Sequence, residues 1–377
     1  MKKILHIITK LEFGGAQINT VYSVNHFASA GNDVTLITGS GGILDKKLID
    51  ERVKLIEIPE LIRNINPFYD FISMLKLYFI IKKNNFDIVH THSSKAGILG
   101  RIAAKLAGTK KILHTVHGWG FSDKQNYLTF RMFVILEQIT AFFTDKIIAV
   151  ANDNIAKGLK NKIGKKNQYT VIRSGIDFEK FEKAYADSTE KKNKTKKNLG
   201  VNCDDLIIVM IGCFKPQKNP IEFIKIASVI NKKYNNIKFI LVGDGALRKD
   251  IEKKIQSNNL SNKVILAGWR TDVQDILAAS DIFCLTSLWE GLPRSILEAY
   301  SCRLPVVATE VDGTPEVVIN NKTGFLYSCG KIEDAVKYLE LLISDKSKRL
   351  KFGENGYDIV NSEFSVQKML ADLEKLY

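Results

Sequence analysis

Apolar, strand-like runs alternate with helix-length segments along the whole chain. Several runs are nearly continuous Val, Ile and Leu, as expected for parallel strands that are buried on both faces of a sheet. This alternation predicts an α/β protein built from doubly wound, Rossmann-like sheets. The runs that we interpret as strands are residues 4–8, 34–38, 53–58, 87–90, 111–116, 146–150 and 169–173, then 206–211, 237–242, 264–266, 282–285 and 305–308.

The length of the chain predicts two domains. Its 377 residues exceed what one ordinary hydrophobic core organises. Between the two series of strands lies a polar, charged segment, residues 182–198, with few β-branched residues. We interpret it as the interdomain connection plus a solvated helix. Domain one is then expected at residues 1–180 and domain two at residues 200–360.

The apolar runs are too short to cross a membrane, since spanning one takes about 18–20 apolar residues. The first run is interrupted by His6 and Thr9 and followed by Lys10 and Glu12. This pattern favours a buried first strand over a signal peptide. The expectation is a cytoplasmic protein.

The formal net charge of +14 favours anionic partners, which include nucleic acid, anionic lipid and phosphorylated substrates. A Lys-rich proteome explains the same charge, because Lys and Asn are scattered along the chain. A basic nucleic-acid-binding protein would bind with strong salt dependence. The chain contains no recognised nucleic-acid-binding motif, which argues against that class.

Cysteine and histidine do not cluster in the sequence. All five cysteines lie in the second half without a C-x-x-C pair, so buried free thiols are expected. All six histidines precede residue 118. His90 and His92 have the spacing that puts two side chains on one face of a strand, where they could hold a metal. A strand end near a cleft explains them more simply, and no metal is expected.

The segment from Glu290 to Glu298 places two carboxylates eight positions apart across a Gly-Leu-Pro turn. Pro293 suits the first turn of a helix, so a helix is expected from about this residue. The free N–H groups of its first turn, which attract anions, would lie between the carboxylates. This arrangement suits a ligand that is part polyol and part phosphate, such as a nucleotide-sugar. A surface helix with two solvated glutamates explains the spacing equally well.

This segment resembles the E-x7-E signature of retaining glycosyltransferases of the two-Rossmann-domain (GT-B) architecture, especially glycosyltransferase family 4. The resemblance covers essentially the whole chain and implies two Rossmann-like domains facing across a cleft. It also implies a last helix, about 364–377, that packs back on domain one. The chain has no Asp-x-Asp, the usual metal handle of the other large glycosyltransferase architecture. The further motifs, in the expected order, are Gly14-Gly15, His114-Thr-Val-His117-Gly118, Gly212 to Lys218, Val242-Gly243-Asp244-Gly245 and Gly313-Thr314-Pro315-Glu316.

The resemblance implies a role for each residue of the nucleotide-sugar side. Lys218 would neutralise the diphosphate and stabilise the leaving nucleoside diphosphate. Glu298 would accept hydrogen bonds from the ribose diol. Glu290 would hold the donor sugar, helped by the backbone N–H groups near Gly291 and Leu292.

Other positions of domain two have two interpretations each. Gly243 allows a ligand to approach the backbone, but a tight turn between strand and helix explains it as well. The resemblance places Arg270, beside Trp269, near the nucleobase; the alternative is an ordinary loop with a half-buried Trp. Cys213 stands where the family usually has arginine, and the candidates to replace that cation are Lys215, Arg270 and Arg294. The missing arginine leaves open a degenerate, sugar-binding relative.

In domain one, Gly15 follows the first strand and precedes a helix expected near Ala16, where exposed N–H groups could meet an anion. A simple tight turn is the alternative. His117 follows a strand, and its imidazole could bond a donor-sugar hydroxyl or stabilise developing charge. His114 lies further inside the same strand and is interpreted as structural. The run Ser93-Ser94-Lys95 could grip an acceptor phosphate, although a plain N-cap explains the serines.

Two stretches of domain one, residues 66–83 and 127–143, mix aromatic and aliphatic side chains with Lys and Arg. Core-facing helices explain part of this composition, and a monotopic membrane face explains the rest. Lys124 and Arg131 would add positive charge near the second stretch. The motifs around His90 and His117 are similar to those of transferases that build bacterial lipid-linked oligosaccharides or capsule repeats.

The main hypothesis is therefore a retaining, metal-independent glycosyltransferase. It would move a hexose from a UDP-sugar to a polyprenyl-diphosphate-linked sugar, while associated peripherally with the inner face of the cytoplasmic membrane. UDP rather than GDP or ADP is implied by the resemblance. The alternatives are a nucleotide-sugar epimerase of the same architecture and a non-catalytic protein that binds nucleic acid or sugar.

Overall fold

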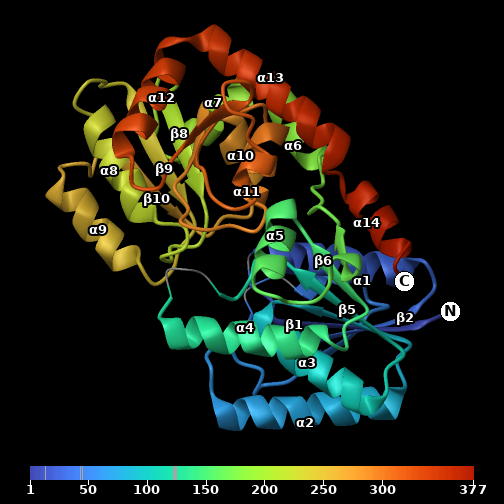
Figure 1. The fold of residues 1–377 in the computed structure, drawn as a ribbon. Helices are drawn as coiled ribbons and strands as arrows, with labels where there is room; N and C mark the ends of the chain where they lie inside the picture. The colour runs from blue at the N-terminus through green and yellow to red at the C-terminus, as the bar shows by residue number, and fades with distance from the viewer. Residues whose placement is uncertain (13, 43, 45, 122–124) are drawn as a thin grey trace. The chain divides into compact units, whose positions relative to one another are not determined.

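A computed structural model describes residues 1–12, 14–42, 44, 46–121 and 125–377. The chain forms two compact units, shown in Figure 1. Unit 1 comprises Met1–Gly175 and Val366–Tyr377, and unit 2 comprises Ile176–Ser365. The chain therefore passes between the units twice, and unit 1 is built from two separate pieces of sequence.

Unit 1 contains a parallel sheet of seven strands in the order β3-β2-β1-β4-β5-β6-β7. The order reverses between β1 and β4, which is the point where ligands bind in open α/β sheets. The strands are β1 (Lys3–Lys10), β2 (Asp33–Gly39), β3 (Lys54–Glu57), β4 (Ile88–His92), β5 (Lys111–Val116), β6 (Lys146–Ala149) and β7 (Tyr169–Val171). The helices are α1 (Gly15–Ser29), α2 (Pro67–Asn84), α3 (Ser94–Ala107), α4 (Tyr127–Ala141), α5 (Asn152–Lys160) and α14 (Val366–Glu374), with 3-10 turns at η1 (Lys46–Leu48) and η2 (Lys166–Gln168).

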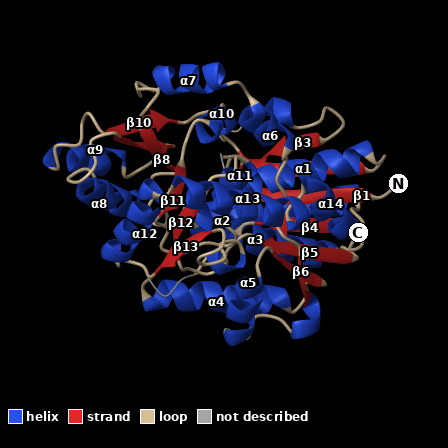
Figure 2. Ribbon diagram, turned by 90° about the horizontal axis from the view of Figure 1, so that it is seen from above, coloured by secondary structure: helices blue, strands red, loops and turns tan. Residues whose placement is uncertain are grey.

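Helices cover both faces of the unit 1 sheet (Figures 1 and 2). Successive side chains of a strand point to opposite faces. Ile4 and Ile8 accordingly join a core that includes residues of α1 and α14. Leu5 and Ile7 join a second core that includes residues of α2 and α3. This covering of both faces explains why β1 is buried at successive positions from Ile4 to Thr9.

Unit 2 contains a parallel sheet of six strands in the order β10-β9-β8-β11-β12-β13. Its order reverses between β8 and β11. The strands are β8 (Leu206–Ile211), β9 (Ile237–Val242), β10 (Val264–Gly268), β11 (Ile282–Leu285), β12 (Val306–Thr309) and β13 (Gly324–Tyr327). The helices are α6 (Glu179–Ala186), α7 (Thr189–Asn198), α8 (Pro220–Ile230), α9 (Arg248–Ser257), α10 (Val273–Ala278), α11 (Arg294–Ser301), α12 (Ile332–Ser344) and α13 (Lys346–Glu363), with a 3-10 turn at η3 (Thr314–Glu316).

The predicted α/β class with two doubly wound parallel sheets is confirmed. The segment 182–198, interpreted from sequence as the interdomain connection plus a solvated helix, lies in unit 2. The solvated helix is confirmed as α7, which has no buried residue, but the first part of the segment belongs to α6 and is not a connection between the units. The physical reason is that α6 carries the fully buried Phe181, which anchors it to unit 2. The first passage between the units falls at Gly175–Ile176, and α14 belongs to unit 1. Strand β13 was not predicted.

The start of α2 shows how local chemistry sets a helix boundary. The side chain of Asn66 accepts hydrogen bonds from the N–H groups of Phe68 and Tyr69, and Pro67 occupies the first helical position. The helix ends at Asn85, which adopts the left-handed conformation that Asn tolerates. None of the helices that the structure describes has the length and apolarity needed to cross a membrane.

A buried ion pair links α3 and α4 in unit 1. Arg101 Nη2 lies 2.6 Å from Glu137 Oε2, and both side chains are almost completely excluded from solvent. Arg101 Nε also donates to the carbonyl oxygen of Gly97 at 2.8 Å. Because removing one partner leaves an uncompensated buried charge, this pair makes the packing of α4 depend on one carboxylate.

We expect Glu137→Ala to lower the free energy of unfolding of unit 1 by about 3–5 kcal/mol, the usual effect of breaking a buried ion pair. Urea unfolding followed by limited proteolysis, which reports the two units separately, measures this. The matched control is Glu60→Ala, which removes the half-buried partner of the exposed Lys76 and should change stability little. Equal effects of the two variants would contradict this account of the Arg101–Glu137 pair.

Candidate active site

The candidate residues of unit 2 lie in loops at the carboxyl ends of its parallel strands. Lys218 follows β8, Gly243 follows β9, Arg270 follows β10 and Glu290 follows β11. In a parallel sheet these loops share one edge, so residues far apart in sequence come close together. Lys218 and Glu290 come from β8 and β11, the two strands on either side of the point where the strand order reverses.

Lys218 and Glu290 form an ion pair at this edge. Lys218 Nζ lies 2.5 Å from Glu290 Oε1, and the side chain of Glu290 is 6% exposed. The hydroxyl of Ser287 donates to the same oxygen at 2.6 Å. The backbone N–H of Glu290 donates to Asp312 Oδ2 at 2.7 Å. The carboxylate is thus held through one oxygen, and Oε2 has no hydrogen-bond partner among the residues that the structure describes.

The loops that carry this ion pair are joined by hydrogen bonds that backbone carbonyl oxygens accept. The N–H of Leu288 donates to the carbonyl oxygen of Gln217 at 2.7 Å. The side-chain amide of Gln217 donates to the carbonyl oxygen of Trp289 at 2.9 Å. The hydroxyl of Thr286 donates to the carbonyl oxygen of Asn219 at 2.9 Å. These bonds pre-organise Lys218 and Glu290 before any ligand arrives.

Glu298 lies on α11, which begins at Arg294, one residue later than the sequence indicated. Arg294 Nε donates to Glu298 Oε1 at 3.1 Å, four positions along the helix. Gly291 and Leu292 connect Glu290 to this helix and are buried. The structure therefore places both carboxylates of the signature in one β11–α11 connection and gives each a basic partner.

The two glycines after β9 are required by packing. Gly243 has φ +135°, and a Cβ atom there would lie 2.1 Å from the carbonyl oxygen of Gly212. Gly245 has φ +156°, and its Cβ would lie 2.7 Å from the carbonyl oxygen of Phe214. Both values belong to conformations that glycine adopts without strain. The loops after β8 and β9 therefore pack backbone to backbone, and a direct ligand contact of Gly243 stays a prediction.

The cations that could replace an arginine at Cys213 differ in their surroundings. Arg270 makes a two-bond ion pair with Asp272, Nε to Oδ1 at 2.7 Å and Nη2 to Oδ2 at 2.6 Å. This hydrogen bonding raises the pKa of Arg270 and lowers the pKa of Asp272. Arg294 is engaged by Glu298. Lys215 lies in the same loop as Cys213, and its N–H donates to the Cys213 carbonyl oxygen at 2.8 Å.

In unit 1, the structure places Gly15 at the first position of α1, preceded by an extended Gly14. The first turn of α1 carries no acidic residue, which keeps its N–H groups favourable for an anion.

The serine and lysine run after β4 is engaged by other side chains. Ser93 precedes α3 with φ +63°, and its hydroxyl lies 2.7 Å from Thr9 Oγ1 instead of capping the helix. Lys95 Nζ forms an ion pair with Asp70 at 2.6 Å. The structure thus brings Lys95 to a carboxylate, which weakens its candidacy as an acceptor-phosphate ligand.

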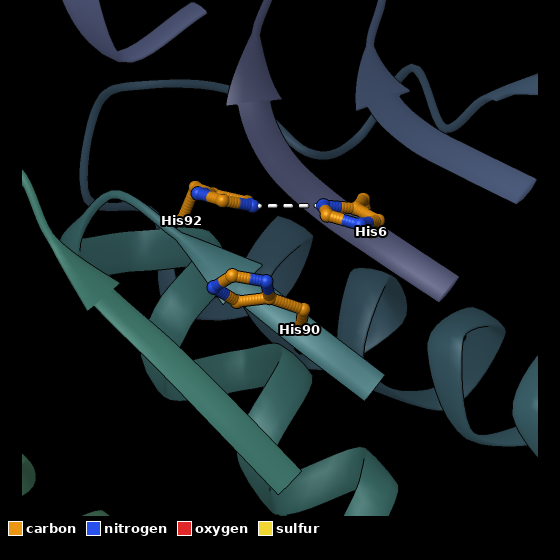
Figure 3. A group of neighbouring side chains, drawn as sticks. All are labelled: His6, His90 and His92. Carbon is orange, nitrogen blue, oxygen red and sulfur yellow. Dashed lines mark hydrogen bonds between the residues drawn. The ribbon is translucent and has the colours of Figure 1, made fainter. Parts of the chain in front are cut away.

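The register of the unit 1 sheet gathers histidines on one face. His6 of β1 pairs with His90 of β4, and His92 of β4 pairs with Thr115 of β5. With a two-residue period these side chains, and His117 after β5, share the face that α1 and α14 cover. His6 Nδ1 lies 3.0 Å from His92 Nε2, as Figure 3 shows. His92 Nδ1 lies 3.2 Å from His117 Nε2.

Burial keeps these histidines neutral. It lowers the pKa of His6 to about 3 and that of His117 to about 4. For His90 and His92, burial and then the neighbouring histidines hold the pKa well below its usual value. His114, on the opposite face, is likewise shifted well down by burial, and its Nδ1 lies 2.9 Å from the Thr91 hydroxyl. It fills the space that Gly97 leaves, which agrees with a structural role.

His6, His90 and His92 offer ring nitrogens that lie within 4.8 Å of one another, a separation that a metal ion could bridge. Each of the three rings, however, already uses both nitrogens in hydrogen bonds within unit 1. Binding a cation would break several of these bonds, so the donor set fits neutral histidines better than metal ligands. A cavity of about 20 Å³ touches His90, His92 and His117. It has room for about one water molecule.

Two residues of the unit 2 ion-pair network, Ser287 and Asp312, were not identified from sequence. Both were visible there in principle, because Ser287 lies three positions before Glu290 and Asp312 precedes the Gly313 turn. In unit 1 no sequence pattern connects Tyr377 with the histidines, although its hydroxyl contacts both His6 and His90.

Comparison with known families assigns each half of the chain. Residues 13–180 match the family model described as Glycosyltransferase Family 4. Residues 191–359 match the model described as Glycosyl transferases group 1. Together the two matches include every candidate residue named above in units 1 and 2 except those before residue 13 and after residue 359.

The chain is 35% identical, over 378 residues, to the UDP-Gal:alpha-D-GlcNAc-diphosphoundecaprenol alpha-1,3-galactosyltransferase of Escherichia coli, with 100% of this chain and 96% of that protein covered. It is 30% identical, over 317 residues, to the N,N'-diacetylbacillosaminyl-diphospho-undecaprenol alpha-1,3-N-acetylgalactosaminyltransferase of Campylobacter jejuni, with 82% of each chain covered. Among solved structures, HepE of Anabaena in complex with UDP and glucose superposes with a TM-score of 0.86 at 21% identity, covering 100% of this chain and 99% of that one. This structural likeness supports the shared fold.

We expect unit 1 to lose stability on acidification more steeply than unit 2. The folded pKa values of His6 and His117 lie below the unfolded value of about 6.5. Between pH 6.5 and about 4 the unfolded chain therefore binds protons at these histidines that the folded unit does not, and the free energy of unfolding falls as the pH falls. Each such histidine removes roughly 1.4 kcal/mol per pH unit within this window. Urea titrations with limited proteolysis at pH 7.0, 6.0 and 5.0 measure the effect for each unit. Unit 2 contains no histidine and is the internal control; equal acid sensitivity of both units would contradict the account.

Proposed function

The chain belongs to glycosyltransferase family 4, with the GT-B architecture, and from this membership we propose which sugar donor it uses and to what it transfers. The donor is a UDP-hexose and the acceptor is a sugar carried on polyprenyl diphosphate, in the synthesis of a bacterial surface glycan. The observation that carries this proposal is the Lys218–Glu290 ion pair, pre-organised at the edge of the unit 2 sheet where nucleotides bind in this fold.

The donor half of the proposal rests on chemistry within unit 2. A nucleotide-sugar presents a diphosphate, a ribose diol and a hexose. Lys218 supplies a cation for the diphosphate, and Glu298 supplies an acceptor for the diol. UDP is favoured because the name of the Escherichia coli relative includes UDP-Gal and HepE was solved with UDP.

In the proposed reaction the negative charge that develops on the leaving diphosphate is met by Lys218. When the diphosphate attracts Lys218, the amine shifts its interaction from Glu290 towards the phosphate oxygens. The Ser287 hydroxyl then continues to donate its hydrogen bond to Glu290 Oε1, and Oε2 accepts a hydrogen bond from a hydroxyl of the donor sugar. We propose that this needs no divalent metal, because the lysine takes the role of the metal cation, and that the anomeric configuration is retained.

We expect Glu298→Ala to weaken UDP binding by roughly ten- to a hundredfold, since hydrogen bonds to a charged acceptor contribute about 1.5–3 kcal/mol. Calorimetry with UDP measures the affinity, and transfer of labelled hexose from UDP-, GDP- and ADP-sugars to polyprenyl-linked sugar, with EDTA present, measures the reaction. The control is Glu340→Ala, which removes a glutamate on α12 that pairs with Lys233.

Label in lipid that disappears in Glu298→Ala, but not in the control, would support the donor, the reaction class and metal independence. Conversion of the donor in the absence of acceptor would favour the epimerase alternative. No binding of any nucleotide by the wild-type protein would overturn the proposal.

The acceptor half of the proposal includes a membrane surface. The helices α2 and α4 lie with α3 on one side of the unit 1 sheet (Figure 1) and carry large apolar side chains that face solvent. Lys76, Lys82, Lys83 and Arg131 lie on the same helices. We name the exposed apolar side chains of the two helices the α2–α4 apolar surface. Its members are Phe68, Tyr69, Phe71, Leu75 and Phe79 on α2, and Tyr127, Leu128, Met132, Ile135, Ile139 and the adjacent Phe142 on α4. Apolar and aromatic side chains beside basic ones suit insertion into an anionic bilayer surface, where a lipid-linked acceptor is presented.

We expect the double variant Phe79→Ser, Leu128→Ser to bind phosphatidylglycerol-containing vesicles at least about tenfold more weakly, because each side chain is well exposed and loses apolar area that the bilayer would bury. Vesicle co-sedimentation measures this, with Leu350→Ser in unit 2 as the matched exposed-leucine control. The membrane proposal would be refuted if the wild-type protein did not bind the vesicles, or if the control variant lost as much binding as the double variant. Neither result would bear on the proposed donor.

A further inference from the structure

A hydrogen-bonded series of side chains crosses one face of the unit 1 sheet and ends at His117. Its contacts are Thr115 Oγ1 with His90 Nε2 at 2.7 Å, His90 Nδ1 with the Tyr377 hydroxyl, that hydroxyl with His6 Nε2 at 3.0 Å, and then the His6–His92 and His92–His117 contacts given above. Figure 3 shows three of the rings, those of His6, His90 and His92. All six residues belong to unit 1.

Each inner histidine of this series uses both ring nitrogens within it, and the Tyr377 hydroxyl makes two contacts within it. A neutral imidazole has one N–H donor and one acceptor nitrogen, and a phenol hydroxyl has a single proton to donate. If one member reverses its direction of donation, its neighbours must reverse as well. The series therefore has only two consistent arrangements of protons, one in which all bonds are donated towards His117 and one in which all are donated away from it.

The two arrangements differ in what they leave at their ends. With donation towards His117, the Thr115 hydroxyl donates to His90, and every donor up to His92 is paired. The four histidines of the series, His90, His6, His92 and His117, then all carry their proton on Nδ1. The Nδ1–H of His117 is the donor that remains for another molecule.

With donation away from His117, the four histidines all carry their proton on Nε2. The Thr115 hydroxyl then accepts from His90, and its own proton has no acceptor among the residues that the structure describes. Each arrangement leaves one donor unpaired, the Thr115 hydroxyl in this one and His117 Nδ1–H in the other. Thr115 is only 6% exposed, whereas His117 is half-buried, so the unpaired donor of this arrangement is the more deeply buried of the two. Because a buried unpaired donor is unfavourable, the arrangement towards His117 is preferred.

Tyr377 is the member that links the two halves of the series. Its ring stacks on Phe27, with centroids 4.0 Å apart and an interplanar angle of 14°. Lys2 Nζ donates to its backbone oxygen at 2.5 Å. The hydroxyl lies between His90 and His6, so it transmits the direction set at Thr115 to the rings beyond.

We propose that Tyr377 is a positioning residue that holds His117 in its Nδ1–H tautomer through His6 and His92. A fixed donor at His117 suits an oxygen acceptor, such as a sugar hydroxyl or a phosphate oxygen. The tautomer follows from the geometry of unit 1, whereas its effect on turnover rests on the proposed function.

The wild-type protein tests the tautomer directly. In protein labelled with ¹⁵N-histidine, imidazole ¹⁵N–¹H correlation spectra distinguish Nδ1–H from Nε2–H, and single His→Gln variants assign the signals. We expect Nδ1–H at His6, His90, His92 and His117. Nε2–H at His117 would overturn the proposal.

Tyr377→Phe removes only the hydroxyl and interrupts the series, so His117 should become a mixture of both tautomers. Tyr78→Phe is the matched control, since it removes a tyrosine hydroxyl on α2, away from the series. A His117 spectrum in Tyr377→Phe that matches the wild type would overturn the linkage through Tyr377. If Tyr377→Phe folds poorly, Thr115→Val, compared with Thr115→Ser, interrupts the far end, and only the valine variant should alter the tautomer of His117.

Transfer kinetics then separate the positioning role from the proposed function. We expect kcat of Tyr377→Phe to fall by roughly two- to tenfold, the equivalent of one neutral hydrogen bond, with UDP affinity unchanged. A changed tautomer with unchanged kcat would overturn the positioning role and leave the transferase intact. A wild-type protein without transferase activity would instead refute the proposed function, while the spectra still decide the tautomer.

Discussion

Parallel strands cannot be joined by tight turns, and this constraint shapes both halves of the molecule. Each connection must cross back over the sheet, so all carboxyl ends, with the loops that follow them, share one edge. In unit 2 the loops after β8 and β11 meet there, and Lys218 forms an ion pair with Glu290, which lies 72 positions further along the chain. In unit 1 the same rule, combined with the two-residue period of a strand, brings His6, His90 and His92 together.

The two units solve the burial of polar groups in different ways. In unit 2, Lys218 and Glu290 offset each other as an ion pair, so opposite charges are available where a diphosphate is proposed to bind. In unit 1, burial removes the charge from the histidines and leaves only their directional hydrogen bonds. Lys218 can move from Glu290 towards a diphosphate whose negative charge increases during the proposed reaction. The neutral histidine series can instead hold His117 in one orientation of its hydrogen bonds.

The sequence predicted what depends on local pattern. Continuous apolar runs located β8 and β9 because strands buried on both faces need them. Strand β13 was missed because, unlike the equally short β11 and β12, it contains no valine or isoleucine that marks a buried run. The helix α6 was mistaken for a linker, since its polar surface hides one anchoring side chain, Phe181. The series through Tyr377 could not be predicted, because it depends on strand register and on contact between residues 287 positions apart.

The division of unit 1 into two pieces of sequence has a consequence for how the protein is made. The ribosome completes Met1–Gly175 first and must then synthesise all of Ile176–Ser365 before α14 appears. At about 5–20 residues per second this takes roughly ten to forty seconds. During that time the face of the first sheet that carries His6 and His90 is covered by α1 but still lacks α14. The nascent chain therefore exposes an apolar surface that chaperones can recognise, and the histidine series closes only when the last helix arrives.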